Sequence, residues 1–214
     1  MSFTVAEVLT EARELLLDTL EPYRYSDAFI IRRINQALRR MCVLRPDLFS
    51  THETISCAAG ILQTCPEGSM RLMDVVMNGD GRALKEIHQD TLDLMAPTWP
   101  AGATASPTDW MRYVRDPNRF YVFPRVEAGA QLSIVYAKSP VTVDLASTIP
   151  LPDAYMPTVI DGTCWLMESI DAEHVESGRA KSFKDSFEGA LTAGLTVRRL
   201  TDTDAGGLPK DEVV

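Results

Sequence analysis

The sequence predicts an α+β protein in which the N- and C-terminal segments form a helical bundle and a β-rich insertion lies between them. Apolar residues recur at helical spacing in residues 1–50 and again in residues 151–200. In residues 51–150 the apolar runs are too short for helices, and turn residues separate them as in a sheet. Residues 201–214 are rich in Asp and Gly, so we expect a flexible C-terminal arm.

Composition supports a core that forms without disulfides or metals. The chain has 214 residues, of which 45% are hydrophobic. Its cysteines are far apart among apolar residues, so we expect buried free thiols. No apolar run approaches the roughly 20 residues that cross a bilayer, and no signal-peptide pattern opens the chain, so we expect a protein that stays inside the cell where it is made and has no membrane contact. The net charge of −9 argues against nucleic-acid binding over the whole surface.

The first predicted helix begins at Thr4, where Glu7 completes the spacing of a capping box. Its apolar face consists of Val5, Val8, Leu9, Ala12, Leu15 and Leu16. An acidic face lies opposite and consists of Glu7, Glu11, Glu14 and Asp18.

The second predicted helix runs from Ser26 to the residue before Pro46. It buries one apolar arc, made of Ile30, Ile31, Ile34, Leu38, Met41 and Cys42. The other arc is cationic and carries Arg32, Arg33, Arg39 and Arg40.

Two further amphipathic helices are predicted near the C-terminus. In the first, Pro157 suits the opening turn, and the apolar positions that follow are Val159, Ile160, Trp165, Leu166 and Ile170. The second follows a break at Ser177 and Gly178, and its apolar face holds Ala180, Phe183, Phe187, Ala190, Leu191 and Gly194.

The insertion reads as a series of strands and turns. A hairpin is predicted with its turn at Ala59 and Gly60 and with Thr54–Cys57 and Ile61–Cys65 as its two strands. The other predicted strands are Arg71–Met77, which leads into a turn at residues 78–81, then Met111–Val114, Arg119–Phe123 and Gln131–Ala137. Between them, Gln89–Met95 fits one or two helical turns and Ala96–Thr108 fits a loop.

The order of these pieces resembles bacteriophage head-to-tail adaptor proteins (connector or gateway proteins) over most of the chain. No single piece is specific, but their succession is hard to match elsewhere. The β-rich part carries the resemblance in Arg71, Leu72, Met73, Asp74, Val75, Asn78 and Gly81, then Leu92, Asp93, Pro97 and Trp99, then Asp116, Pro117, Arg119, Phe120, Val122 and Pro124. The C-terminal half carries it in Leu151, Pro152, Asp153 and Tyr155 and in the helical pair that follows.

This resemblance implies a structural virion protein at the neck of the phage, assembled in the host cytoplasm. Such proteins form a homo-oligomeric ring, commonly a dodecamer, that joins the portal protein to the tail or nozzle protein. Genomic DNA passes through the ring without sequence-specific binding. A terminal arm docks into the portal, and in this chain the apolar residues of the arm are Leu208, Val213 and Val214. A functionless frayed end is the other interpretation of that segment.

The charged faces have three interpretations. A ring needs one surface of a subunit to meet a different surface of the next, so the acidic and cationic faces could form a complementary subunit interface. The commonest role of charged helix faces is simply to be solvated, and a third interpretation is that the arginines bind DNA. The DNA interpretation supports the alternative function, a DNA-binding or genome-packaging accessory protein, and an unrecognised enzyme ranks third.

Signals for chemistry are weak, and neither catalytic residues nor a cofactor is predicted. One ligand-rich cluster, made of Asp171, Glu173 and His174, fits helix capping better than metal binding. Cys164 could pair with His174 as a nucleophile and its base, but its apolar surroundings favour a core cysteine. Trp99 and Trp110 flank the predicted loop. They are either contact residues for the tail or another partner, or they fill the end of the β-rich part.

Overall fold

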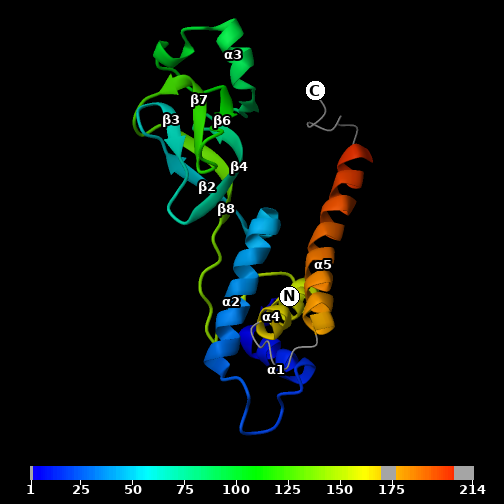
Figure 1. The fold of residues 1–214 in the computed structure, drawn as a ribbon. Helices are drawn as coiled ribbons and strands as arrows, with labels where there is room; N and C mark the ends of the chain where they lie inside the picture. The colour runs from blue at the N-terminus through cyan, green and yellow to red at the C-terminus, as the bar shows by residue number, and fades with distance from the viewer. Residues whose placement is uncertain (1, 170–176, 205–214) are drawn as a thin grey trace. The chain divides into compact units, whose positions relative to one another are not determined.

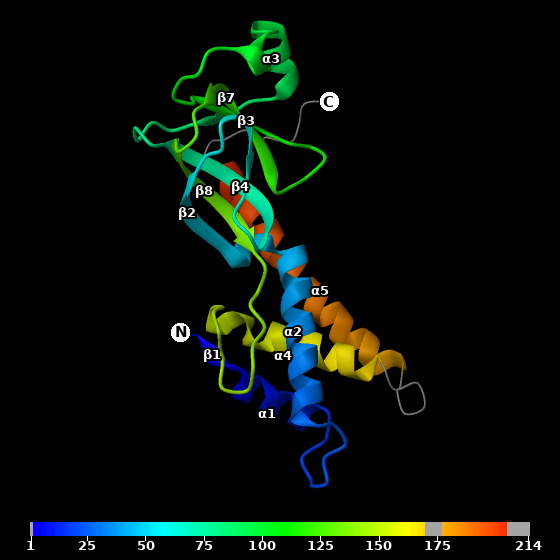
Figure 2. The same cartoon turned by 90° about the vertical axis from the view of Figure 1, so that its left-hand side faces the viewer.

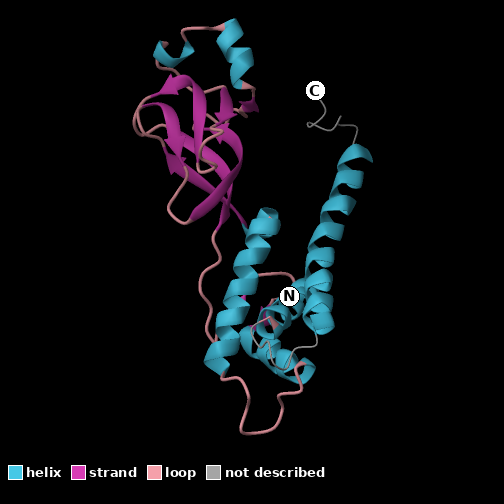
Figure 3. Ribbon diagram, in the orientation of Figure 1, coloured by secondary structure: helices cyan, strands magenta, loops and turns pink. Residues whose placement is uncertain are grey.

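The computed structural model describes residues 2–169 and 177–204 (Figure 1). The chain divides into two compact units. Residues up to 45, together with residues from 141 onward, form what we call the helical unit, and residues 46–140 form the β unit. Helices dominate the first and strands the second (Figure 3), which confirms the α+β class.

The helical unit is arranged around α4 (Met156–Glu168), which contacts each of the other long helices of the unit (Figure 2). These are α1 (Val5–Leu15), α2 (Asp27–Leu44) and α5 (Ser177–Asp204). The 3-10 helix η3 (Asp153–Tyr155) leads into α4, and β1 (Phe3–Thr4) pairs antiparallel with β9 (Thr148–Ile149). The central position of α4 depends on a small residue. A Cβ at Gly162 would lie 2.7 Å from the ring of Phe187 on α5.

Helix α1 begins as predicted. The Thr4 hydroxyl accepts a hydrogen bond from the Glu7 amide at 3.2 Å, and the Glu7 carboxylate accepts one from the Thr4 amide at 2.7 Å. The Thr4 hydroxyl also donates to this carboxylate at 2.8 Å, and the two bonds that the carboxylate accepts from Thr4 lower the pKa of Glu7. Four of the six predicted apolar residues are buried, whereas Leu15 is exposed and Leu16 is half-buried at the C-cap.

Two predictions for the ends of helices are wrong. Asp18 does not extend the acidic face of α1, because the helix ends at Leu15 and Asp18 is buried beside Arg13. Helix α5 continues to Asp204, so residues 201–204 are helical rather than part of an extended arm. Residues 205–214, with Leu208, Val213 and Val214, lie outside the described residues, as do Ile170, Asp171, Glu173 and His174.

The β unit consists of two sheets. The first has the order β2-β8-β4, formed by β2 (Ser50–Ser56), β8 (Gln131–Lys138) and β4 (Ser69–Asn78). The second has the order β3-β7-β6-β5, formed by β3 (Gly60–Thr64), β7 (Arg119–Val126), β6 (Asp109–Arg112) and β5 (Lys85–Glu86). The helical elements of the unit are η1 (Pro46–Phe49), α3 (Gln89–Met95) and η2 (Trp99–Ala101).

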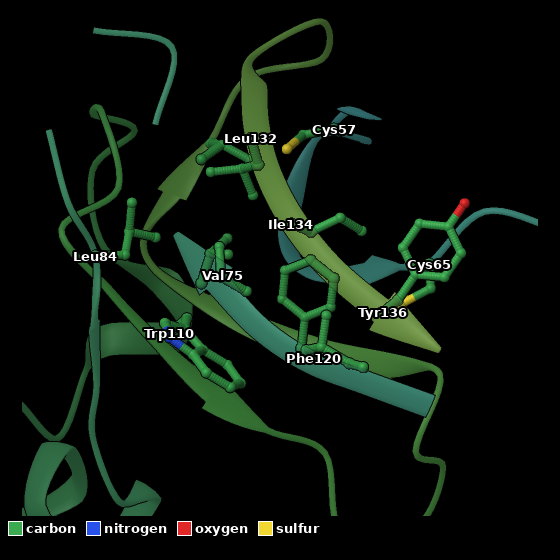
Figure 4. Packing of buried hydrophobic residues seen from close by; sticks show 12 residues of the cluster. Cys57, Cys65, Val75, Leu84, Trp110, Phe120, Leu132, Ile134 and Tyr136 are labelled. Atoms are coloured by element: carbon green, nitrogen blue, oxygen red, sulfur yellow. The ribbon is translucent and has the colours of Figure 1, made fainter. Parts of the chain in front are cut away.

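The core of the β unit lies between these sheets (Figure 4). Every second side chain along β8 points into this core, namely Leu132, Ile134 and Tyr136. They face Trp110 and Phe120 of the other sheet, and all five side chains are at most 1% exposed. This confirms the alternation predicted for the strand. Strand β6 pairs antiparallel with β7, so the strands predicted at residues 111–114 and 119–123 are neighbours, although β6 covers residues 109–112.

The predicted hairpin of residues 54–65 is wrong. Strand β2 pairs with β8, whereas β3 pairs with β7 in the other sheet. The Gln63 side chain explains how the chain turns between the sheets. Its amide accepts a hydrogen bond from the Ala58 N–H and donates one to the Ala58 carbonyl, both at 2.9 Å, so it fixes the connection through which the chain passes from one sheet to the other.

Candidate interaction surfaces

The arginines of α2 form a cationic face. Arg32, Arg39 and Arg40 are exposed and Arg33 is half-buried. Arg33 donates a hydrogen bond to Gln36 at 2.7 Å, and Arg39 donates one to Thr142 at 3.3 Å. Within the described part of the chain, no carboxylate forms an ion pair with any of the four. Their charges are therefore available to a partner.

Aromatic rings support these guanidinium groups. Arg40 lies over the ring of Trp165 with 4.4 Å between its Cζ and the ring centroid, and Arg33 lies 4.7 Å from the Phe29 centroid. A guanidinium that stacks on a ring still has its N–H groups free to bind a carboxylate or a phosphate. The cationic face is thus held in position by packing.

A groove lies beside this face, between α2, α4 and α5. It holds about 320 Å³. We call it the arginine groove. Its lining residues are Arg39, Arg40, Val43, Leu44, Trp165, Phe187 and Glu188. Val43 is 66% exposed although it is apolar, so nothing in the described chain covers this wall. The groove combines an apolar wall with a cationic rim.

The acidic face is smaller than the sequence predicted. Glu7, Glu11 and Glu14 are exposed on α1, and Glu7 is engaged by the Thr4 cap. No ion pair joins these three carboxylates to the arginines of α2 in the described residues. The structure therefore does not bring the two predicted halves of the interface together within one subunit.

A buried ion-pair network, which sequence reasoning missed, fixes the connection between α1 and α2. Arg13 bonds to Asp18 at 2.7 Å, to Asp27 at 2.6 Å and to the Tyr25 carbonyl at 2.8 Å. Asp18 in turn accepts a hydrogen bond from the Arg24 amide at 2.7 Å. The available signal was the position of Arg13, four residues after Leu9 on the apolar side of the helix.

The connection itself, residues 16–26, exposes large apolar side chains. Leu17 is 84% exposed, Leu20 is 83% exposed, and Tyr23 is 45% exposed. We call this segment the α1–α2 loop. Its exposed apolar residues follow neither helical nor strand periodicity, so no pattern in the sequence singles them out.

Trp99 and Trp110 are core residues. Trp110 is fully buried between the sheets, and Trp99 is buried with Leu92 and Met111 in a second small cluster. The Trp99 indole donates a hydrogen bond to Asp93 at 2.7 Å. Both rings fill the β unit, which agrees with the second of the two interpretations of these residues and not with the partner-contact interpretation.

The described residues offer little for catalysis. They contain no group of three or more His, Cys, Asp or Glu residues that could hold a metal ion. Every cysteine is a buried free thiol, and burial raises the pKa of Cys164 to about 12 and that of the other three to about 11. Thiolates are scarce at such pKa values, so these groups are poor nucleophiles. No described helix has both the length and the hydropathy needed to span a bilayer.

Comparison with protein families supports the resemblance drawn from the sequence. The family described as SU10 adaptor protein matches residues 3–208, which is nearly the whole chain. A search of curated proteins gives no match. The chain belongs to the SU10 adaptor protein family, a family of phage adaptor proteins.

Proposed function

We propose that this member of the SU10 adaptor family is a ring-forming, non-enzymatic subunit that joins the portal to the tail or nozzle protein at the virion neck. The family match over residues 3–208 carries the proposal. We propose a ring of about twelve subunits, assembled in the host cytoplasm, with the genomic DNA passing through its centre. Residues 205–214, with Leu208, Val213 and Val214, serve as the arm that docks into the portal.

The charged faces of the helical unit support a head-to-tail ring. Exposed carboxylates lie on α1, and arginines with no described carboxylate partner lie on α2. A ring needs two different, complementary surfaces on each subunit. We propose that Glu7, Glu11 and Glu14 of one subunit meet the neighbour's arginine face, which consists of Arg32, Arg33, Arg39 and Arg40.

The experiment is to mix the purified chain with its portal and to compare the mixture with the free chain. We expect sedimentation to show a free subunit that is largely monomeric at micromolar concentration, and electron microscopy to show a ring on the portal. Absence of any chain bound to the portal would contradict the adaptor function. A stable ring without portal would contradict only the proposed order of assembly.

The alternative function, a DNA-binding or packaging accessory protein, is favoured by one observation, the lack of described carboxylate partners for the arginines of α2. The net charge of −9 opposes it, because phosphates are repelled by an acidic subunit.

We expect weak binding to duplex DNA at physiological salt. A submicromolar dissociation constant that is lost when Arg32, Arg33, Arg39 and Arg40 become Gln would favour the alternative. The matched control changes the exposed Arg71 and Arg82 of the β unit to Gln.

A further inference from the structure

We propose that the α1–α2 loop of one subunit inserts Leu17 and Leu20 into the arginine groove of a second copy of the chain. The inference rests on the proposed ring and names the contact that builds it. It follows from an apolar protrusion and an apolar groove on the same unit, neither of which is covered in the described chain.

The protrusion is held in shape before binding. Leu17 has a backbone φ of 57°, a left-handed conformation that is unfavourable for leucine and persists only when its surroundings impose it. The buried Asp18 imposes it, since this carboxylate bonds to Arg13 and accepts hydrogen bonds from the Arg24 and Tyr25 amides. A preorganised loop loses little conformational entropy on binding, which favours association.

The groove suits an apolar side chain followed by an acidic one. Val43, Leu44 and Trp165 line an apolar wall, and Arg39 and Arg40 form a cationic rim. The only carboxylate of the lining, Glu188, already pairs with Lys184 at 3.8 Å.

The loop carries the complementary charges. Glu21 directly follows Leu20, and Glu14 lies one residue before the end of α1; both are exposed. Arg24 is the cation of the loop, and its guanidinium lies over the Tyr25 ring at 5.1 Å. We therefore expect Glu14 and Glu21 to face Arg39 and Arg40 across the contact.

A subunit cannot fill its own groove with its own loop. Arg13 ties the loop to Asp27, the first residue of α2, whereas Val43 lies near the last. At about 1.5 Å per residue these two positions are roughly 24 Å apart along a rigid helix. Figure 1 shows the loop at one end of α2. The contact must therefore be between copies, and because loop and groove are different surfaces, repeating it produces a ring or a filament.

The first test is disulfide cross-linking on the portal-bound protein. One variant carries Leu20→Cys and another carries Leu44→Cys, and the native cysteines are buried. Under mild oxidation an equimolar mixture should give dimers, each variant alone should give none, and a chain with both changes should give a ladder of multimers. The matched control replaces Leu20→Cys by Leu94→Cys and should not cross-link, because Leu94 is a leucine of similar exposure in the β unit. Dimers from Leu20→Cys alone would overturn the proposal, because they would show loop meeting loop.

The second test does not depend on disulfide geometry. Leu17→Asp with Leu20→Asp should weaken subunit association on the portal at least about a hundredfold, because burial of each leucine is worth about tenfold or more. Leu94→Asp is the control and should leave the ring intact.

Normal rings from the double Asp variant would overturn the loop contact and leave the adaptor function standing. Failure of the unaltered chain to bind the portal would instead contradict the adaptor function itself. If Val43→Lys prevented even single subunits from binding the portal, the groove would take a portal segment and the proposal would be wrong.

Discussion

The helical unit holds its two chain segments together partly with buried polar contacts, whereas the β unit closes around an apolar core. In the helical unit, the Asn35 side chain accepts a hydrogen bond from the Val143 amide at 2.8 Å and donates one to its carbonyl at 2.9 Å. Arg45 is buried and donates to the Leu191 carbonyl at 3.1 Å. In the β unit, the buried polar side chains Gln63 and Asn78 serve turns, and the space between the sheets is filled by apolar residues.

This difference matches how each unit is built from the chain. The β unit is continuous, while the helical unit joins residues before 46 to residues after 140. Hydrophobic burial is not directional, so it does not by itself select one alignment of two separate segments. A hydrogen bond has a fixed geometry, and an unmade one is costly when buried. We therefore expect the polar contacts to decide how the segments of the helical unit align.

The largest expected effect tests the ion-pair network of the helical unit. Arg13→Ala leaves the buried Asp18 carboxylate without the cation that pairs with it and should lower the free energy of unfolding by about 3–5 kcal/mol. Hydrogen exchange should show lost protection in α1 and α2 and unchanged protection in β8. The double variant Arg13→Met with Asp18→Leu should recover part of the loss. Equal loss of protection in both units would remove the distinction between them.

A core substitution gives the corresponding test of the β unit. Leu132 is fully buried on β8, so Leu132→Ala should cost about 2–5 kcal/mol through lost burial and the cavity it creates. Urea unfolding measures this change. Leu62→Ala, at a partly exposed position of β3, is the control and should cost much less. A small effect at Leu132 would mean that the apolar core does not hold the unit together.

A smaller effect is expected when a single polar contact is removed from the helical unit. Asn35→Ala leaves the buried amide and carbonyl of Val143 without their partner and should cost about 1–3 kcal/mol. Protection from hydrogen exchange should fall around residue 143. The neighbouring exposed Gln36→Ala should change stability little. An unchanged exchange rate at Val143 would show that hydrophobic packing alone aligns the return segment.

The smallest effect is a pH dependence in the β unit. Tyr136 donates a hydrogen bond to the Glu53 carboxylate at 2.6 Å, and this bond, together with burial and the negative charge of Glu53, raises the pKa of Tyr136 from 10.0 to about 12. The stabilisation that comes from protonated Tyr136 is complete below pH 10.0 and is lost as the pH rises toward about 12. In this range Tyr136 keeps its proton in the native state but releases it in the unfolded chain. Denaturant midpoints measured across this window should fall. Tyr136→Phe should make this fall shallower without removing it, because the four buried thiols, whose pKa values are also raised, lose stabilisation in the same pH range. An unchanged slope in that variant would assign the whole effect to these and other groups.

The sequence by itself determined the features that depend on residues close together in the chain. Thr4 and Glu7 are three residues apart, and their capping box is present. The alternation of Leu132, Ile134 and Tyr136 placed one face of β8 in the core, and the turn after β4 is closed by Asn78 as its residues predicted. Each of these signals acts within about four residues, so no knowledge of the rest of the fold was needed.

The tertiary structure decided the features that depend on distant residues. Strands β2 and β3 look like a hairpin locally, yet the packing of two sheets gives them different partners. Asp18 reads as an exposed acid at helical spacing, but its charge is buried because Arg13 and the backbone of residues 24 and 25 surround it. The arginine groove is formed by three helices from both ends of the chain. Sheet partners, burial of a charge and a groove all depend on contacts between segments far apart in sequence, and local spacing carries no record of them.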